Sequence, residues 1–194
     1  DSYKHIWQPT AVMLGKAPYP GLEQLEEQVE KAGARLHVVE PAALVEHDGR
    51  WVSVDARLSN DLVEEALRAG RLGPLAGYPA MRREVSFGRS RFDFMLEAPQ
   101  RPPCLVEVKS VTLVVDGLGC FPDAVTSRGR RHVMELAQAA AAGYRAAVLF
   151  CVQREDATGV RPHDESDPDF GRALRDAVAQ GVEVYALGCH VEPE

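Results

Sequence analysis

The residues best suited to chemistry are two acids and a lysine in neighbouring apolar runs. Asp93 lies within residues 92–96, and Glu107 and Lys109 lie within residues 104–110. Side chains alternate faces along a β-strand, so Glu107 and Lys109 project from one side of a sheet and the valines beside Glu107 from the other. An antiparallel neighbour carrying Asp93 would bring both carboxylates to one divalent cation. Oxygen ligands of this kind suit Mg²⁺ or Mn²⁺, so the pattern predicts a cation site for phosphodiester hydrolysis.

Each predicted site residue has an expected role. Asp93 and Glu107 would bind the cation, and Glu84 on the preceding strand candidate could supply a carboxylate for a second one. Lys109 would orient the attacking water or stabilise charge that grows on phosphorus. The alternative interpretation is that each acid is an ordinary solvent-facing strand residue. Lys109 is the only lysine after Lys31 in a chain with 18 arginines and 4 lysines, which favours a specific use for its compact charge.

Basic residues cluster around these acids although the chain as a whole carries a formal net charge of −7. DNA affinity rests on neutralising phosphates, so a local basic patch would be needed for nucleic-acid binding. The arginines of the two clusters are Arg82, Arg83, Arg89 and Arg91 around Asp93, and Arg128, Arg130 and Arg131 at the start of the next helix. The alternative is that these arginines only solvate the protein surface.

Apolar periodicity predicts the elements that position these residues. We expect a helix over residues 60–69, capped by Asn60 and ended by Gly70, and a helix over 127–142 capped at Thr126 or Ser127. The further predicted elements are strands at 10–14, 35–40, 51–55, 82–87, 91–96, 105–115 with a kink near Ser110, 146–152 and 182–187, and helices at 21–32 and 168–180. Gly88 and the Pro102-Pro103 pair are expected in turns.

Three segments resemble a known family. Residues 90–96, 106–113 and 121–129 followed by His132 are similar to the signature of the SfsA (sugar fermentation stimulation protein) family, and Asp93 with Glu107 and Lys109 resembles the D…(D/E)-x-K pattern of PD-(D/E)XK nucleases. The resemblance implies an α/β fold with an αβββαβ restriction-endonuclease-like core in residues 59–194. It also implies DNA binding. The residues expected at the DNA are Arg82, Arg89, Arg91, Thr126, Arg128, Arg131 and His132.

The N-terminal part departs from the family pattern. The resemblance holds from about Gly49, and the Pro-Asn-Thr-Gly motif of the family's OB-fold domain is absent. Residues 10–40 instead predict a strand, a helix and a strand. Residues 1–58 are therefore expected to form a small, atypical N-terminal subdomain beside the nuclease-like domain.

Three functional classes stay open at this point. The first is a Mg²⁺- or Mn²⁺-dependent deoxyribonuclease, and the second is a DNA-binding regulator of sugar-catabolism genes that does not cut DNA. The third is a small-molecule or protein-interaction module. No Walker A or Rossmann glycine pattern supports a nucleotide-cofactor enzyme. Nucleases of this fold often dimerise, so the resemblance also implies a homodimer.

Composition limits the setting of the protein. An apolar fraction of 45% can build a globular core, no apolar run approaches a membrane span of roughly 20 residues, and the N-terminus does not read as a signal peptide. We therefore expect a soluble, cytoplasmic protein without a membrane partner. The four cysteines have no metal-ligand spacing and are expected to be buried, reduced thiols rather than zinc ligands. These are Cys104, Cys120, Cys151 and Cys189.

Overall fold

A large mixed β-sheet forms the centre of the computed structural model, which describes residues 8–12, 36–39, 42–47, 49–53 and 56–191. The helix predicted at 21–32 lies outside the described residues. Nine strands lie side by side in the order β5 (Ala80–Phe87), β6 (Ser90–Ala98), β7 (Arg101–Val111), β10 (Arg145–Val152), β12 (Glu183–Gly188), β1 (Gln8–Val12), β11 (Gly159–Pro162), β9 (Leu118–Phe121) and β8 (Val114–Val115). A second, antiparallel sheet contains β2 (Leu36–Val39), β3 (Ala42–His47) and β4 (Arg50–Ser53).

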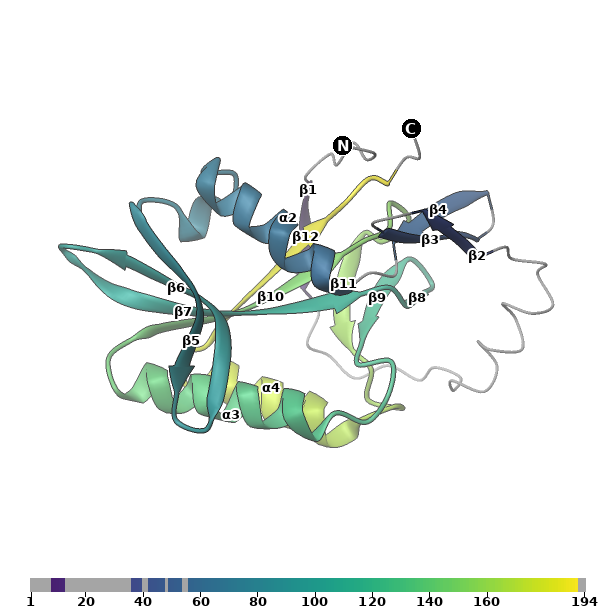
Figure 1. Ribbon diagram of the computed structural model, residues 1–194. Coiled ribbons are helices and arrows are strands. Elements are labelled where there is room, and N and C mark those ends of the chain that lie inside the picture. Colours follow the sequence, from purple (N-terminus) through teal and green to yellow (C-terminus); the bar gives the residue numbers. More distant parts are fainter. Residues whose placement is uncertain (1–7, 13–35, 40–41, 48, 54–55, 192–194) are drawn as a thin grey trace.

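Helices cover both faces of the large sheet. Helix α2 (Ala56–Arg68) lies on one face, while α3 (Ser127–Ala141) and α4 (Pro168–Ala179) lie on the other (Figure 1). Strand β10 pairs in parallel with both β7 and β12, and seven of its eight residues are buried. A strand that is buried on both faces has a continuous apolar sequence, and this pattern correctly predicted a strand at residues 146–152. The predicted α/β class is confirmed.

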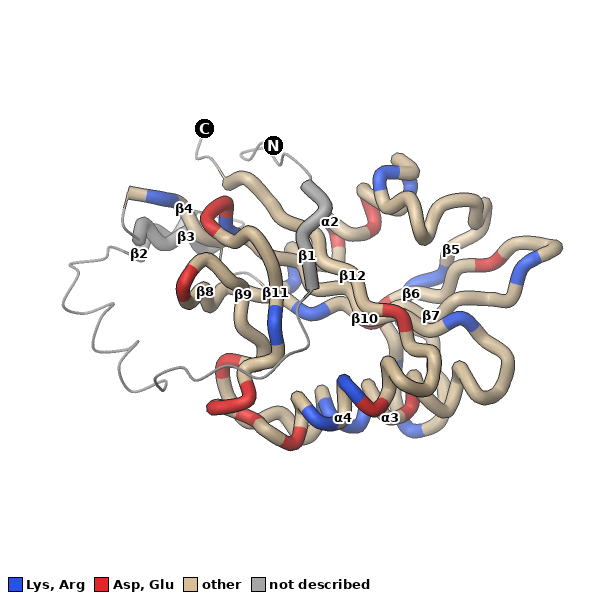
Figure 2. The backbone as a smooth tube through the Cα atoms, turned by 180° about the vertical axis from the view of Figure 1, so that it is seen from behind, with Lys and Arg blue, Asp and Glu red and all other residues tan. Residues whose placement is uncertain are grey.

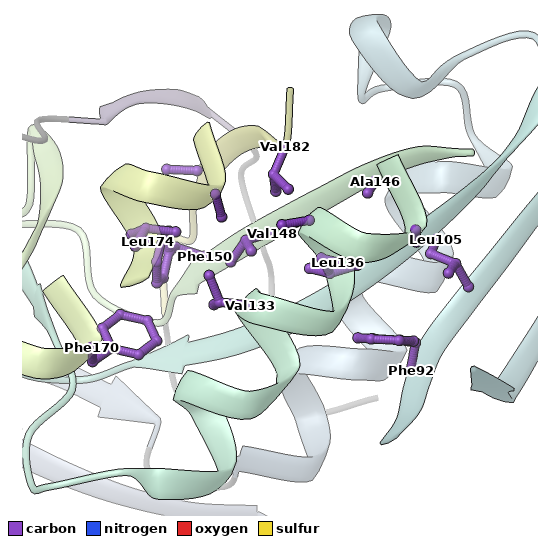
Figure 3. Close-up of a cluster of buried hydrophobic side chains, with 14 of the residues drawn as sticks. Phe92, Leu105, Val133, Leu136, Ala146, Val148, Phe150, Phe170, Leu174 and Val182 are labelled. Carbon is purple, nitrogen blue, oxygen red and sulfur yellow. The ribbon is translucent and has the colours of Figure 1, made fainter. Parts of the chain in front are cut away.

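The core on the α3 and α4 side is built from residues at helical and strand spacing. Val133 and Leu136 of α3, three residues apart, pack onto Val148 and Phe150 of β10, and Phe170 of α4 closes the cluster (Figure 3). Each of these side chains is at most 1% exposed. Because apolar residues recur on one stripe of each helix, the helices can only lie with that stripe on the sheet.

The first turns of α3 and α4 are joined by one carboxylate. Thr126 is the N-cap of α3 and accepts a hydrogen bond from the Gly129 backbone N–H at 3.0 Å, which confirms the predicted cap. A Cβ on Gly129 would lie 2.8 Å from the Thr126 side chain, so the close capping turn requires glycine there. Asp167 caps α4 through the Phe170 N–H at 2.9 Å and accepts the Thr126 N–H at 2.8 Å. Both helix starts are therefore fixed together.

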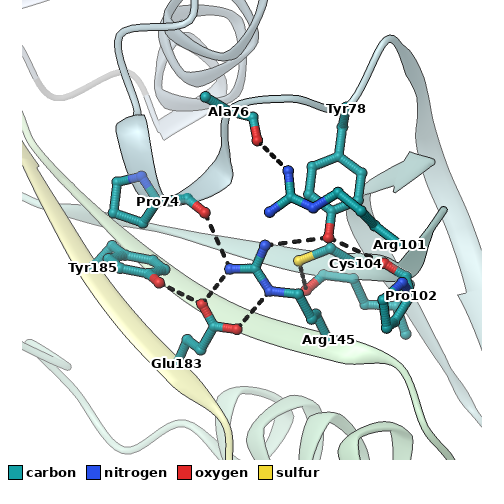
Figure 4. Close-up of polar contacts among 10 residues, drawn as sticks. Pro74, Ala76, Tyr78, Arg101, Pro102, Cys104, Arg145, Glu183 and Tyr185 are labelled. Carbon is teal, nitrogen blue, oxygen red and sulfur yellow. Dashed lines mark hydrogen bonds and ion pairs between the residues drawn. The ribbon is translucent and has the colours of Figure 1, made fainter. Parts of the chain in front are cut away.

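An arginine network anchors the segment that follows α2. Arg145, the first residue of β10, forms a two-point ion pair with Glu183 of β12, with N–O distances of 2.8 and 2.6 Å. The same guanidinium donates to the Tyr78 hydroxyl at 3.2 Å and to the carbonyl of Pro74, within the short 3₁₀ helix Gly73–Leu75, at 3.1 Å (Figure 4). The loop after α2 is thus held against the ends of two central strands.

Two predicted features, the start of the first described helix and a turn, lie elsewhere in the structure. Helix α2 begins at Ala56, so Asn60 lies inside the helix and is not its cap. Pro102 and Pro103 lie within β7 and not in a turn. Proline has no backbone N–H, but the two prolines are tolerated there because the pairing of β7 with β10 starts only at Cys104. No hydrogen bond from residue 102 or 103 to β10 is therefore lost.

Short strands near the far edge were not predicted. The expected strand 105–115 ends at Val111 in β7 and resumes as the two-residue β8, which agrees with the kink expected near Ser110. Strands β9 and β11 pair in parallel with each other, and neither lies in a segment that was predicted to be a strand. A strand of four residues is too short for the alternation of apolar and polar residues to be distinguished from chance.

Strand β1 joins the large sheet between β12 and β11. It pairs with β12 in antiparallel and with β11 in parallel orientation. The first strand of the described residues therefore contributes to the sheet that carries residues 80–188. The boundary predicted between residues 58 and 59 stays a prediction.

The cysteine expectation is confirmed for all four residues, which are free and buried. Burial raises the pKa of the Cys104 thiol to about 12, so this group is protonated and inert at neutral pH. Among the described helices, none is both long and apolar enough to cross a lipid bilayer.

Candidate metal and nucleic-acid site

Asp93 lies where the ladder between β6 and β7 ends. The two strands are antiparallel neighbours, as predicted, and their pairing runs from Ala98 with Arg101 to Phe94 with Val106. One residue further, the Asp93 carboxylate accepts the backbone N–H of Val108 at 2.7 Å. In an unbroken ladder the Val108 N–H would donate to a backbone carbonyl oxygen of the neighbouring strand, but here it donates to the Asp93 carboxylate. This hydrogen bond holds Asp93 beside the segment of β7 that carries Glu107.

Asn60 holds the other oxygen of Asp93. Its side-chain amide donates to Asp93 Oδ1 at 2.9 Å from the interior of α2. Burial and the negative charge of Glu107 raise the pKa of Asp93 above its usual value, although the hydrogen bonds from Val108 and Asn60 oppose this shift.

Glu107 is the most buried acid of the site, with 3% of its surface exposed. Its Oε1 accepts from Lys109 Nζ at 2.5 Å and is in contact with His132 Nδ1. Burial alone would raise the pKa of Glu107, but the His132 hydrogen bond and the Lys109 charge outweigh it, so the pKa is lowered. Glu107 is therefore ionised at neutral pH. Its Oε2 is buried and has no hydrogen-bond partner among the described residues.

The expectation of one shared face is met by Glu107 and Lys109, whereas the strand alternation expected around Asp93 is not observed. Phe92 and Phe94 were expected together on the opposite face from Asp93, but Phe92 lies in the core cluster on the α3 side and Phe94 in the cluster on the α2 side. Strict alternation is broken at this point of β6. Asp93 consequently hydrogen-bonds toward α2, whereas Glu107 hydrogen-bonds toward α3.

Glu84 lies at the same level of the neighbouring strand but points elsewhere. The β5–β6 pairs on either side of it join Arg83 to Phe94 and Val85 to Phe92. Its φ of 54° lies in the left-handed region that non-glycine residues seldom adopt. Its side chain is 64% exposed and lies 3.5 Å from Arg91. The structure thus does not bring Glu84 to the other acids, and its role at a second cation stays a prediction.

The predicted DNA-contacting residues lie in two groups. On the β5–β6 hairpin, Arg82 pairs with Glu97 at 2.9 Å, Arg91 lies near Glu84, and Arg89 is exposed. At the start of α3, Arg128 Nε donates to His132 Nε2 at 3.4 Å and Arg131 is exposed, whereas Thr126 is engaged as the helix cap and His132 is buried. Basic and acidic residues lie close together where α3 and α4 pack side by side, and Arg130 of α3 pairs with Asp169 of α4 (Figure 2).

Gln153 is a site neighbour that the sequence did not reveal. It follows β10 directly and is fully buried, and its amide donates to Ser59 Oγ of α2 at 3.1 Å and to Ser110 Oγ of β7 at 3.0 Å. It therefore ties α2 to the strand that carries Glu107 and Lys109. A polar residue that ends an apolar strand is a weak signal, because most such residues face solvent.

The donor set fits a hard divalent cation. Mg²⁺ is usually held by one or two carboxylates together with water and phosphate oxygens. Asp93 and Glu107 supply two carboxylates. The Oε2 atom of Glu107 is buried without a hydrogen-bond partner among the described residues, and burying such an atom is unfavourable in free energy unless a ligand binds it. Within the described residues there is no group of three or more His, Cys, Asp or Glu side chains arranged for a metal.

The fold and the site define a mixed α/β protein with a buried acid–lysine cluster on its central strands, and comparison gives the family. A model of the "Sugar fermentation stimulation protein RE domain" matches residues 57–194. A sugar fermentation stimulation protein homologue from Moorella thermoacetica is 46% identical over 174 residues, which is 90% of this chain and 75% of that protein. The chain belongs to the SfsA family.

Further relatives agree. A homologue of the same name from Symbiobacterium thermophilum is 51% identical over 78% of this chain, and this chain spans 62% of that relative's length. The solved structure of Pyrococcus furiosus SfsA in complex with Ca²⁺ matches with a TM-score of 0.71 and 27% identity, covering 78% of this chain and 71% of the other.

Proposed function

We propose that this chain is a DNA-binding protein whose acid–lysine cluster hydrolyses phosphodiester bonds with the help of Mg²⁺ or Mn²⁺. The observation that carries the proposal is the buried, ionised Glu107 with one unpartnered oxygen, next to Asp93 and Lys109. The order of α2, β5, β6, β7, α3 and β10, with the short strands β8 and β9 inserted between β7 and α3, supports a nuclease-type core, because helix, three strands, helix and strand is the order expected for it.

Asp93 and Glu107 would hold the cation. When bound, such a cation polarises a phosphoryl oxygen and lowers the pKa of a bound water. The Pyrococcus furiosus relative was solved in complex with Ca²⁺, which also takes oxygen ligands, and this supports a divalent cation for this chain without naming its ligands.

The residues of the chain itself perform the rest. Val108 and Asn60 fix the Asp93 carboxylate through its two oxygens. Lys109, whose side chain is 12% exposed, places a positive charge beside Glu107, where it would stabilise negative charge that grows on the phosphate. The exposed Arg89 and Arg131 would meet backbone phosphates on either side of the cluster.

The test is cleavage of labelled single-stranded, duplex and branched DNA in Mg²⁺ or Mn²⁺. We expect Glu107→Gln and Lys109→Met to lower the cleavage rate by about 10²–10³-fold, the size typical for loss of one electrostatic group, while DNA binding persists. Glu65→Gln, an exposed change on α2, is the matched control and should leave the rate unchanged. Glu84→Gln tests the predicted second cation: a similar loss would assign that ligand to Glu84.

A second candidate is a DNA-binding regulator that does not cut. The naming of the relatives after stimulation of sugar fermentation favours it. DNA binding without cleavage in any divalent cation would overturn the hydrolase proposal and favour this candidate. Absence of both DNA binding and cleavage would favour the small-molecule or protein-interaction class.

A further inference from the structure

The two oxygens of Glu107 have different surroundings. Oε1 accepts from Lys109 Nζ at 2.5 Å and contacts His132 Nδ1, whereas Oε2 is buried without a hydrogen-bond partner in the described part of the chain. A carboxylate that rotated about its last bond would exchange these two environments. Some group must therefore hold Oε1 in place.

His132 is placed to do this. It lies on the first half of α3, is 2% exposed, and packs edge-on against the Phe92 ring with centroids 5.7 Å apart. The imidazole therefore has little freedom to turn. Lys109 also reaches Oε1, but its side chain is long and flexible, whereas the histidine ring is rigid and enclosed.

Arg128 contacts the ring nitrogen of His132 that faces away from Glu107. Its Nε donates to His132 Nε2 at 3.4 Å from one turn earlier in α3. Arginine has only donors, so Nε2 must be the acceptor in this contact. In the neutral ring the proton is then on Nδ1, the atom that faces Glu107 Oε1, and the histidine donates to the carboxylate.

We propose that His132 is a positioning residue that fixes the orientation of Glu107, so that Oε1 stays with Lys109 and Oε2 is presented to a divalent cation, with Arg128 selecting the required tautomer. The proposal rests on the proposed cation site. It differs from packing alone, because only a donor at the Nδ1 position can perform this role. It differs also from acid–base catalysis, because the role assigned to the ring is to orient Glu107 and not to transfer a proton.

Two substitutions separate the donor from the packing. The amide nitrogen of asparagine reaches about the position of Nδ1, whereas that of glutamine reaches about the position of Nε2. We therefore compare His132→Asn with His132→Gln and His132→Ala in the full chain, measuring Mn²⁺ binding without DNA from the magnetic resonance signal of free Mn²⁺. Thermal unfolding of each variant confirms that it is folded.

We expect His132→Asn to bind Mn²⁺ nearly as the native chain does. His132→Gln and His132→Ala should bind it about 10–100-fold more weakly, the usual cost of losing a hydrogen bond to a metal ligand. Arg128→Gln, an exposed change that leaves the core intact, should weaken binding in the same direction by a smaller factor. This variant answers the question even if the changes at His132 unfold the protein.

The outcomes distinguish this inference from the function on which it rests. If the native chain and Glu107→Gln bind Mn²⁺ equally, both the proposed cation site and the proposed role of His132 are refuted. If Glu107→Gln loses binding while all folded His132 variants and Arg128→Gln bind like the native chain, the site stands and His132 is only a packing residue.

Discussion

Asn60, the only asparagine of the chain, holds Asp93 from a position inside α2 where it has no capping role. Asn60→Asp would replace the donor with a second negative charge against a half-buried carboxylate. We expect it to lower the free energy of unfolding by about 1–3 kcal/mol, and Asn60→Ala by about 1 kcal/mol. Urea unfolding measures both. Gln138→Glu, the same chemical change at an exposed position of α3, is the control, and equal effects of the two acid substitutions would refute the role of Asn60.

Single residues show how far sequence reasoning reaches. Alternation along a strand was enough to place Glu107 and Lys109 together, because that contact spans two residues. The contacts of Asn60 with Asp93 and of Gln153 with Ser59 join residues 33 and 94 positions apart, and they depend on how α2 lies on the sheet. No local pattern encodes such a distance, so these partners could not be predicted.

The starts of α3 and α4 depend on Asp167, which is 2% exposed and accepts two backbone N–H groups. Burial would raise its pKa, but the hydrogen bonds from Thr126 and Phe170 outweigh this, so its pKa in the folded state is below the unfolded value. The stabilisation is therefore complete above about pH 4 and is lost as the pH falls through the folded pKa.

Asp167→Ala should consequently lower the free energy of unfolding by about 1–2 kcal/mol at pH 7. The difference from the native chain should shrink when urea unfolding is repeated at about pH 3.5. Asp167→Asn keeps a capping oxygen without the charge, so its own loss should be smaller. A gap between the native chain and Asp167→Ala that is the same at both pH values would contradict the assigned pKa direction.

Elements were predicted where their periodic signal is long. The helices that became α3 and α4 and the buried strand β10 were expected within one residue of their observed ends. The start of α2 was wrong because Asn60 satisfies capping preferences yet is used by a tertiary contact. The break of alternation between Phe92 and Phe94 occurs beside the positive φ of Glu84, a backbone feature that residue type does not announce.

At the scale of the molecule, the central question is whether β1 is a necessary part of the sheet. It lies between β12 and β11 and pairs with both. The segment that matches the family starts at residue 57 and does not include it. Without β1, two interior strands would present unpaired backbone edges, which favour association with other chains.

A chain restricted to residues 57–194 should therefore unfold at a lower temperature than residues 8–194 and should aggregate. Thermal unfolding and light scattering after size exclusion measure the two effects. That truncation also removes β2, β3 and β4, so a second variant is needed that disrupts β1 alone. Thr10 pairs with Ala186 inside the sheet, and Thr10→Pro in the full chain removes the backbone N–H of this residue. Both changes should act in the same direction if β1 completes the sheet. A stable, monomeric 57–194 would instead make the predicted boundary at residue 58 a true domain boundary.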